Sequence, residues 1–251
     1  RAGALASAMT IQALPLQIMA ERLACNVSAP LSSQFGTAGL VRAIGFVNDM
    51  LLEKTKGHPE TQGMGATVAV AYCVENGVLA LAHLGDTRAY LMRNGYLERL
   101  TSDHTVAEML FQAGRISRRQ LRRHPARHVL TRHIGKTDCP AADAALLPLQ
   151  PGDRILLCTD GLTGMLEDRE IGTILWKTKD REAACRLLID HSNQAGGRDN
   201  ITAVIMDVEE RLRRRRRRRQ KIVVRRKVGR SFANAQREEK RKEEPSLTQE
   251  A

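Results

Sequence analysis

Two acidic dipeptides stand at the ends of strands that read as buried, where their side chains could bind a metal ion. Asp160-Gly161 follows the apolar run 155–158 after one threonine, and Asp199-Asn200 directly precedes the apolar run 201–206. If the two strands are neighbours, both carboxylates can converge on one cation, and hard divalent cations prefer such oxygen ligands. We interpret the pair as a sign of metal-assisted phosphate chemistry rather than of a generic α/β domain.

The elements that must position these residues differ along the chain. Apolar residues at helical spacing predict helices, with Pro15 as a kink or break in the first. The predicted helices are 2–24, 38–54, 105–113, 168–176 and 181–194.

The middle of the chain follows a strand-like pattern. Asn76-Gly77 and Asn94-Gly95 are the strongest short hairpin signals, and they separate apolar runs. The predicted strands are 66–75, 78–84, 89–92 and 96–100, then 154–159 and 200–208. The first four read as an antiparallel meander, which argues against a doubly wound parallel sheet. Helices at both ends around these strands indicate an α+β layered sandwich.

Composition limits the class of protein. The 251 residues, 42% of them hydrophobic, can form one large or two small domains with a sizeable core, which must be aliphatic because only 3% are aromatic. We find no apolar stretch near the roughly 18–20 uncharged residues of a membrane span and no signal-peptide pattern. We therefore expect a cytoplasmic protein without a transmembrane segment.

The cysteines argue against a disulfide framework or a zinc site. Their number is odd, they are scattered, and no Cys-x-x-Cys occurs, which fits a reducing compartment. They are Cys25, Cys73, Cys139, Cys158 and Cys185.

The net charge of +12 belongs to one end of the chain. Residues 211–251 contain 17 Lys+Arg and 5 Asp+Glu, whereas residues 1–210 contain 23 of each and are neutral. We therefore predict a globular body, 1–210, and a basic disordered tail, 211–251, which includes seven consecutive arginines from Arg213. The tail is either a solvated extension or a binder of nucleic acid or an anionic membrane surface.

Five short motifs occur in an order that resembles a known family, the metal-dependent protein serine/threonine phosphatases of the protein phosphatase 2C type, in their compact bacterial form. The resemblance covers roughly residues 1–208. The motifs are Gly65-Ala66-Thr67, Gly85-Asp86-Thr87-Arg88, Leu100-Thr101-Ser102-Asp103-His104, Pro151-Gly152-Asp153-Arg154 leading into Cys158-Thr159-Asp160-Gly161-Leu162, and Gly197-Arg198-Asp199-Asn200-Ile201-Thr202.

The resemblance implies a fold and a site. The family fold is an antiparallel β-sandwich flanked by helices on both faces, and its members hold two Mn²⁺ or Mg²⁺ ions that activate water to hydrolyse phosphoserine and phosphothreonine. Asp160 and Asp199 match metal ligands of the family. Asp86 matches a ligand of a weaker third ion. The implied partners are phosphorylated proteins and a cognate serine/threonine kinase.

Each assignment has a structural alternative. Asp-Gly and Asp-Asn are common turn pairs, so either aspartate alone could be a turn or cap residue. Asp103-His104 reads as the N-cap region of the following helix rather than as a catalytic pair. His83 and Cys158 read as buried strand residues. The basic segment 115–128 is similar in position to the family's mobile flap, and it either steers phosphorylated substrates or is a solvated surface.

Family members normally begin with a phosphate-binding arginine, a Glu-Asp pair and an Asp-Gly-x-Gly-Gly segment, which are not found here. We therefore expect the chain as given to bind Mn²⁺ weakly, to be poorly stable and to have little activity. The alternative is a catalytically dead, phosphatase-like binding or scaffolding module with a polyanion-binding tail. A third interpretation makes polyanion binding by the tail the main function.

Overall fold

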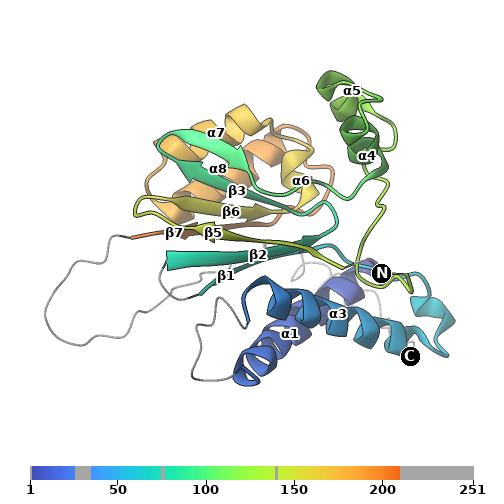
Figure 1. Cartoon of the computed structure of the whole chain (residues 1–251). Coiled ribbons are helices and arrows are strands. Elements are labelled where there is room, and N and C mark those ends of the chain that lie inside the picture. The colour runs from blue at the N-terminus through green and yellow to red at the C-terminus, as the bar shows by residue number, and fades with distance from the viewer. Residues whose placement is uncertain (1, 26–34, 75–76, 139–140, 210–251) are drawn as a thin grey trace, which may run out of the picture.

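The computed structural model describes residues 2–25, 35–74, 77–138 and 141–209. Within them, two antiparallel sheets pack against each other and helices cover the outer face of each sheet (Figure 1). This architecture confirms the predicted α-β-β-α sandwich. The basic segment 211–251 lies outside the described residues, so the division into body and tail stays a prediction.

The first sheet has the strand order β1-β2-β5, all antiparallel. Its strands are β1 (Val68–Cys73), β2 (Val78–Leu84) and β5 (Asp143–Pro148). β2 is buried on both faces: Ala80 and Ala82 join the core beneath the helices, and Leu79 joins the core between the sheets. The sequence pattern did not predict β5. Most of its residues are exposed, so no buried face imposes an alternating pattern.

The second sheet has the strand order β4-β3-β6-β7, again antiparallel. Its strands are β4 (Tyr96–Arg99), β3 (Arg88–Arg93), β6 (Arg154–Cys158) and β7 (Ala203–Asp207). Leu91 and Ile155 face the first sheet, whereas Tyr90 and Leu156 face the helices. The predicted hairpin at Asn94-Gly95 is confirmed, with φ of 51° and 84°, the left-handed values that its turn requires.

The predicted continuous meander is wrong at one point. β2 and β3 do not pair but belong to different sheets, so Gly85-Asp86 carries the chain from one layer to the other. Side chains of both sheets pack between the two layers, so the chain must turn sharply to pass from one layer to the other. The predicted strand segments themselves are confirmed.

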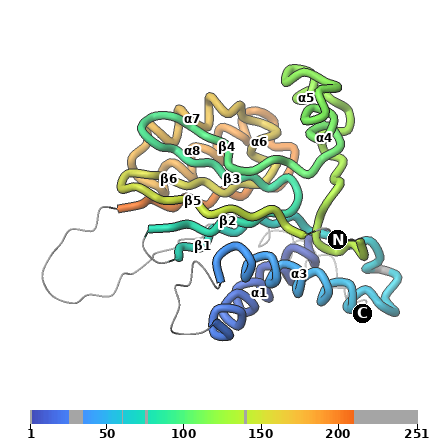
Figure 2. Tube along the Cα trace, viewed as in Figure 1, coloured from blue at the N-terminus to red at the C-terminus, as the bar shows by residue number. Residues whose placement is uncertain are grey.

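The helices form the two outer layers (Figures 1 and 2). α1 (Ala2–Leu23) and α3 (Gly36–Thr55) cover the first sheet, and α7 (Asp168–Lys177) and α8 (Arg181–Gln194) cover the second. The shorter elements are η1 (Pro59–Thr61), α4 (Val106–Gln112), α5 (Arg118–Arg123) and α6 (Asp160–Thr163). Of the predicted kink or break at Pro15, a break is wrong, because α1 continues through this residue.

α1 also corrects an expectation about membranes. By length and composition it could cross a membrane, with a mean hydropathy of 1.3 over its most apolar window. In this structure a stripe of Ala6, Thr10, Leu14 and Ile18 is buried, and α1 packs against α3. A core helix meets the same criterion, so the helix alone is weak support for a membrane span.

The layer crossing at Gly85 gives a testable prediction. Gly85 has φ of +111°, and a Cβ there would lie 2.3 Å from Cγ2 of Thr67. Gly85→Ala is therefore expected to lower the free energy of unfolding by about 2–4 kcal/mol, through backbone strain and overpacking. Gly152, with φ of +91° and open space around it, is the matched control, and Gly152→Ala should cost only about 1 kcal/mol. Equal losses in urea unfolding would contradict the packing argument.

Candidate functional site

Asp160 and Asp199 lie at the same end of two paired strands. Asp160 follows β6 and is the first residue of α6, and Asp199 lies in the loop that enters β7. β6 and β7 pair in a register that places Cys158 opposite Ala203. The two strands are therefore neighbours, which is the condition that the predicted shared metal site requires.

The backbone holds the two loops in close contact. Thr159 N donates to Thr202 O at 3.1 Å, and Thr202 N donates to Thr159 Oγ1 at 3.0 Å. A Cβ on Gly161 would lie 2.3 Å from Asn200 O, so only glycine permits this approach. The turn-forming Asp-Gly and Asp-Asn pairs thus also serve to bring the two carboxylates together.

Asp160 is repelled by the charge of Asp199 and in turn repels Asp86. Burial and the charge of Asp199 raise the pKa of Asp160. Burial and the charges of Asp160 and Asp103 raise the pKa of Asp86 to about 7. Carboxylates that are partly buried beside one another in this way are stabilised by a cation. The donor set, all hard oxygens, fits Mn²⁺ or Mg²⁺.

A cavity of about 380 Å³ opens beside Asp86 and Asp160. One part of its wall is acidic and includes Asp103, Glu108 and Asp168. The remaining wall is rich in arginine. The basic lining residues are Arg88, Arg99, Arg118, Arg122, Arg123, Arg127 and His128.

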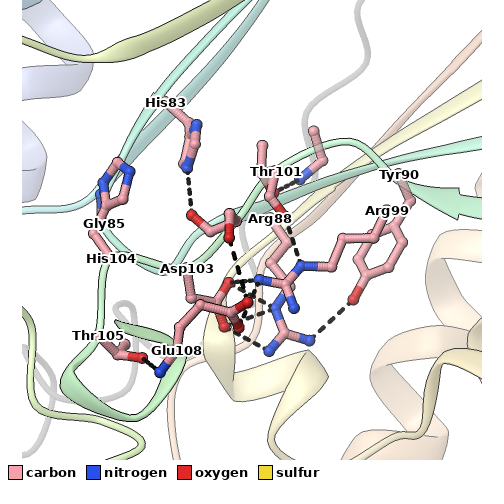
Figure 3. Close-up of polar contacts among 12 residues, drawn as sticks. His83, Gly85, Arg88, Tyr90, Arg99, Thr101, Asp103, His104, Thr105 and Glu108 are labelled. Atoms are coloured by element: carbon pink, nitrogen blue, oxygen red, sulfur yellow. Dashed lines mark hydrogen bonds and ion pairs between the residues drawn. The ribbon is translucent and has the colours of Figure 1, made fainter. Parts of the chain in front are cut away.

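Arg88 anchors the loop that carries Asp86 (Figure 3). Its guanidinium donates to both oxygens of Asp103, with the shortest contact from Nη2 to Oδ2 at 2.6 Å. It also donates to Tyr90 Oη at 3.1 Å, and Arg99 Nη2 lies 2.8 Å from Asp103 Oδ1. Although burial lowers it, the hydrogen bonds to Asp103 raise the pKa of Arg88 above its ordinary value.

The predicted role of Asp103-His104 is therefore corrected. The N-cap of α4 is Thr105, whose side chain accepts from Glu108 N. Asp103 binds the two arginines instead, and His104 Nδ1 accepts from Gly85 N at 3.0 Å. Both residues therefore hold the chain where it crosses between the sheets: His104 binds Gly85, and Asp103 binds Arg88. The ion pair with a residue distant in sequence takes the place of the predicted contact with the helix N-terminus.

His83 and His104 form a second cluster of chemically active groups. Their rings stack with centroids 4.5 Å apart, and His104 Nε2 lies 3.0 Å from Asp143 Oδ2. Within the described residues, His83, His104 and Asp143 form the cluster of three ligand groups close enough for a metal. However, Arg132 Nη1 lies 2.9 Å from His104 Nε2 and 2.7 Å from Asp143 Oδ1. The guanidinium occupies the cation position, so the cluster fits a structural brace.

α4 and α5 project away from the sandwich, and α5 forms part of the basic segment 115–128 (Figure 1). α5 was not predicted from the sequence, although Ser117 and Gln120 form a capping box, a pattern typical of a helix N-terminus. Two contacts connect this segment to the rest of the structure: an ion pair of Arg122 with Glu167 at 2.9 Å, and His128 Nδ1, which lies 3.8 Å from Asp160 Oδ2.

The structure brings some predicted site residues together and leaves others apart. Asp160 interacts electrostatically with Asp86 and with Asp199, and the role of these aspartates as metal ligands stays a prediction. His83 and Cys158 are buried, as predicted. The sequence analysis missed the structural role of Arg88, although this residue stands in the Gly85–Arg88 motif.

Comparison with known proteins gives consistent matches. The family profile described as protein phosphatase 2C matches residues 33–110. The chain is 31% identical over 182 residues to the serine/threonine phosphatase stp of Listeria monocytogenes, with 72% of each protein covered. It is 32% identical over 215 residues to the protein phosphatase PhpP of Streptococcus pneumoniae, covering 84% of this chain and 82% of that protein.

Solved structures agree with the sequence matches. The serine/threonine phosphatase PstP/Ppp of Mycobacterium tuberculosis superposes with a TM-score of 0.74 at 29% identity, covering 83% of both chains. The catalytic domain of PstP in complex with two manganese ions superposes with a TM-score of 0.70 at 28% identity, again covering 83% of both chains.

Proposed function

This chain belongs to the protein phosphatase 2C family of metal-dependent serine/threonine phosphatases, and we propose that Asp160 and Asp199 are its metal ligands. Enzymes of this family use Mn²⁺ or Mg²⁺. The proposed reaction is hydrolysis of phosphoserine and phosphothreonine in proteins by metal-activated water. Phosphorylated proteins, together with a cognate serine/threonine kinase, are the proposed partners.

One observation carries this assignment: Asp160 and Asp199 stand at the same end of two paired strands, and Asp160 lines an open cavity. A bound divalent ion lowers the pKa of a coordinated water and shields phosphoryl oxygens. Asp160 and Asp199 would hold the ions, and Asp86 would add a ligand for a weaker one. Arg88 and Asp103 keep Asp86 in place by bracing its loop.

The test is hydrolysis and metal binding measured together. We expect Mn²⁺-dependent release of phosphate from a phosphothreonine peptide, and we expect this chain to bind Mn²⁺ weakly in calorimetry. The reason for weak binding is that Asp160, Asp199 and Asp86 supply few of the six or more oxygens that such ions take. Tight saturable binding would contradict the expectation of impairment. Phosphopeptide binding without any hydrolysis would favour the alternative, a catalytically dead phosphatase-like module.

A pH dependence follows from Asp86 in the metal-free protein. Its folded-state pKa of about 7 exceeds the ordinary aspartate value near 4, so the folded state holds a proton that the unfolded state has lost between these values. Stability therefore falls as pH rises through this window. Because water in the cavity screens the charge, we expect a loss of about 1–2 kcal/mol from pH 5 to pH 8.

The measurement is urea unfolding with a chelator at both pH values. Asp86→Asn should flatten the dependence, whereas Asp190→Asn, an exposed control on α8, should leave it unchanged. If the unfolding free energy of Asp86→Asn changes with pH as much as that of the unmodified chain, another group causes the pH dependence.

A further inference from the structure

The cavity beside Asp86 has a second wall that the proposed hydrolysis does not use. This wall comes from α5 and the residues after it, and His128 at its end lies 3.8 Å from Asp160. Its members are basic or apolar. They are Arg118, Leu121, Arg122, Arg123, Arg127 and His128.

Several arginines of the cavity already have partners. Arg88 and Arg99 bind Asp103, and Arg122 binds Glu167. Their positive charge is therefore largely neutralised before any substrate arrives. These residues build the cavity rather than recognise an anion in it.

Three lining arginines remain without an acidic partner among the described residues: Arg118, Arg123 and Arg127. Arg118 lies over the ring of Phe111, with its guanidinium carbon 5.9 Å from the centroid, and keeps its charge. Arg123 is exposed and Arg127 is half-buried. The same cavity thus presents unpaired guanidinium groups a short way from the aspartates that would hold the metal.

This arrangement differs from a merely solvated charged segment. Arg115 and Arg119 belong to the same segment and are exposed, but they do not line the cavity. The segment therefore divides into arginines that face the cavity and arginines that do not. The first group, on the wall facing Asp86 and Asp160, could contact a peptide while its phosphate lies at the metal-binding loops.

We propose that this wall selects phosphopeptides that carry a second anionic group beside the phosphorylated residue, bound chiefly by Arg123 and Arg127. This inference rests on the proposed function, because it assumes that the phosphate lies at Asp160 and Asp199. The planar guanidinium fork matches both carboxylate and phosphate oxygens. The flanking anion is therefore either an acidic side chain or a second phosphate.

The experiment measures equilibrium binding by fluorescence anisotropy in one Mn²⁺ buffer. Three labelled peptides carry a non-hydrolysable phosphonate in place of the phosphothreonine phosphate. The residues beside it are neutral in the first peptide, glutamate in the second and a second phosphonate in the third. At low ionic strength we expect the two anionic peptides to bind about tenfold more tightly than the neutral one, with the difference shrinking as salt is added.

Two double variants test the residues. Arg123→Ala with Arg127→Ala should reduce the preference to about twofold or less, because both cavity contacts are gone. Arg115→Ala with Arg119→Ala removes the same charge from the same segment and should keep the preference. The basic residues 211–251 are present in every protein, so their attraction for acidic peptides cancels in this comparison. Arg123→Glu should make the neutral peptide bind more tightly than the anionic ones. Such a reversal cannot arise from a general loss of binding.

The outcomes separate this inference from the proposed function. Equal affinities for all three peptides, or an equal loss of preference in both double variants, would overturn the inference. Tighter binding of either anionic peptide than of the neutral one supports the inference. The peptide that binds more tightly shows whether a carboxylate or a second phosphate is the preferred neighbouring group. Hydrolysis of the matching phosphopeptides is measured separately. Hydrolysis without preference contradicts only the inference, whereas preference without hydrolysis contradicts only the proposed function.

Discussion

Replacing Asp160 or Asp199 by asparagine is expected to lower kcat for a phosphothreonine peptide by about 10²–10³-fold or more. A coordinated metal ion contributes several kcal/mol to the transition state, and each 1.36 kcal/mol corresponds to a factor of ten. An amide has no negative charge to hold the ion, although it nearly preserves the shape of the side chain. The measurement is steady-state phosphate release over a range of Mn²⁺ concentrations.

Urea unfolding distinguishes the loss of a metal ligand from damage to the fold. Burial and the charge of Asp199 raise the pKa of Asp160, so the ionised carboxylate opposes folding when no metal is bound. Asp160→Asn should therefore unfold at the same or a higher urea concentration than the unmodified chain in chelator, while its activity collapses. Asp190→Asn, exposed on α8, is the control and should retain activity. Near-normal turnover in both site variants would remove these aspartates from the metal site.

The second large effect is expected at Arg88, whose substitution by alanine should lower the free energy of unfolding by about 2–4 kcal/mol. Arg88 and Asp103 are 20% and 11% exposed, and their bidentate contact is nearly desolvated. Removing one member of a buried pair leaves the other charge uncompensated, which typically costs about 3–5 kcal/mol. Arg99 still contacts Asp103 at 2.8 Å and compensates part of its charge, so we expect a loss that extends somewhat below that range.

Arg186 provides the matched control for this prediction. It pairs with Glu182 at 3.0 Å on the exposed surface of α8, and both side chains are about half exposed. Surface pairs of this kind contribute about 0.3–0.5 kcal/mol, so Arg186→Ala should hardly change urea unfolding. Equal losses of unfolding free energy in Arg88→Ala and Arg186→Ala would show that burial does not decide the strength of the Arg88 pair. Arg88→Ala should also lower Mn²⁺-dependent activity, because its anchor holds the loop that carries Asp86.

Local patterns predicted most of the elements. The apolar runs that became β2 and β6 and the periodic segments that became α7 and α8 were found within a few residues of their observed bounds. These segments have buried faces, which impose a period on the sequence. β5 and α5 were missed because both are largely exposed. β5 is stabilised by pairing with β2, and α5 by its capping box. Neither interaction requires apolar residues at a regular spacing in the sequence.

The sequence by itself determined which residues are candidates for the chemistry: Asp86, Asp160 and Asp199 stand in motifs with strand-end turn residues, and hard carboxylates predict a divalent metal. Only the tertiary structure decided that β2 and β3 lie in different sheets, and that the chain crosses between them at Gly85-Asp86. It also decided that Asp103 binds Arg88 rather than capping a helix, and that Arg123 and Arg127 line the cavity. The physical reason is that these outcomes depend on packing and ion pairs between residues distant in sequence. Neither turn chemistry nor hydrophobic period, which act over a few residues, contains that information.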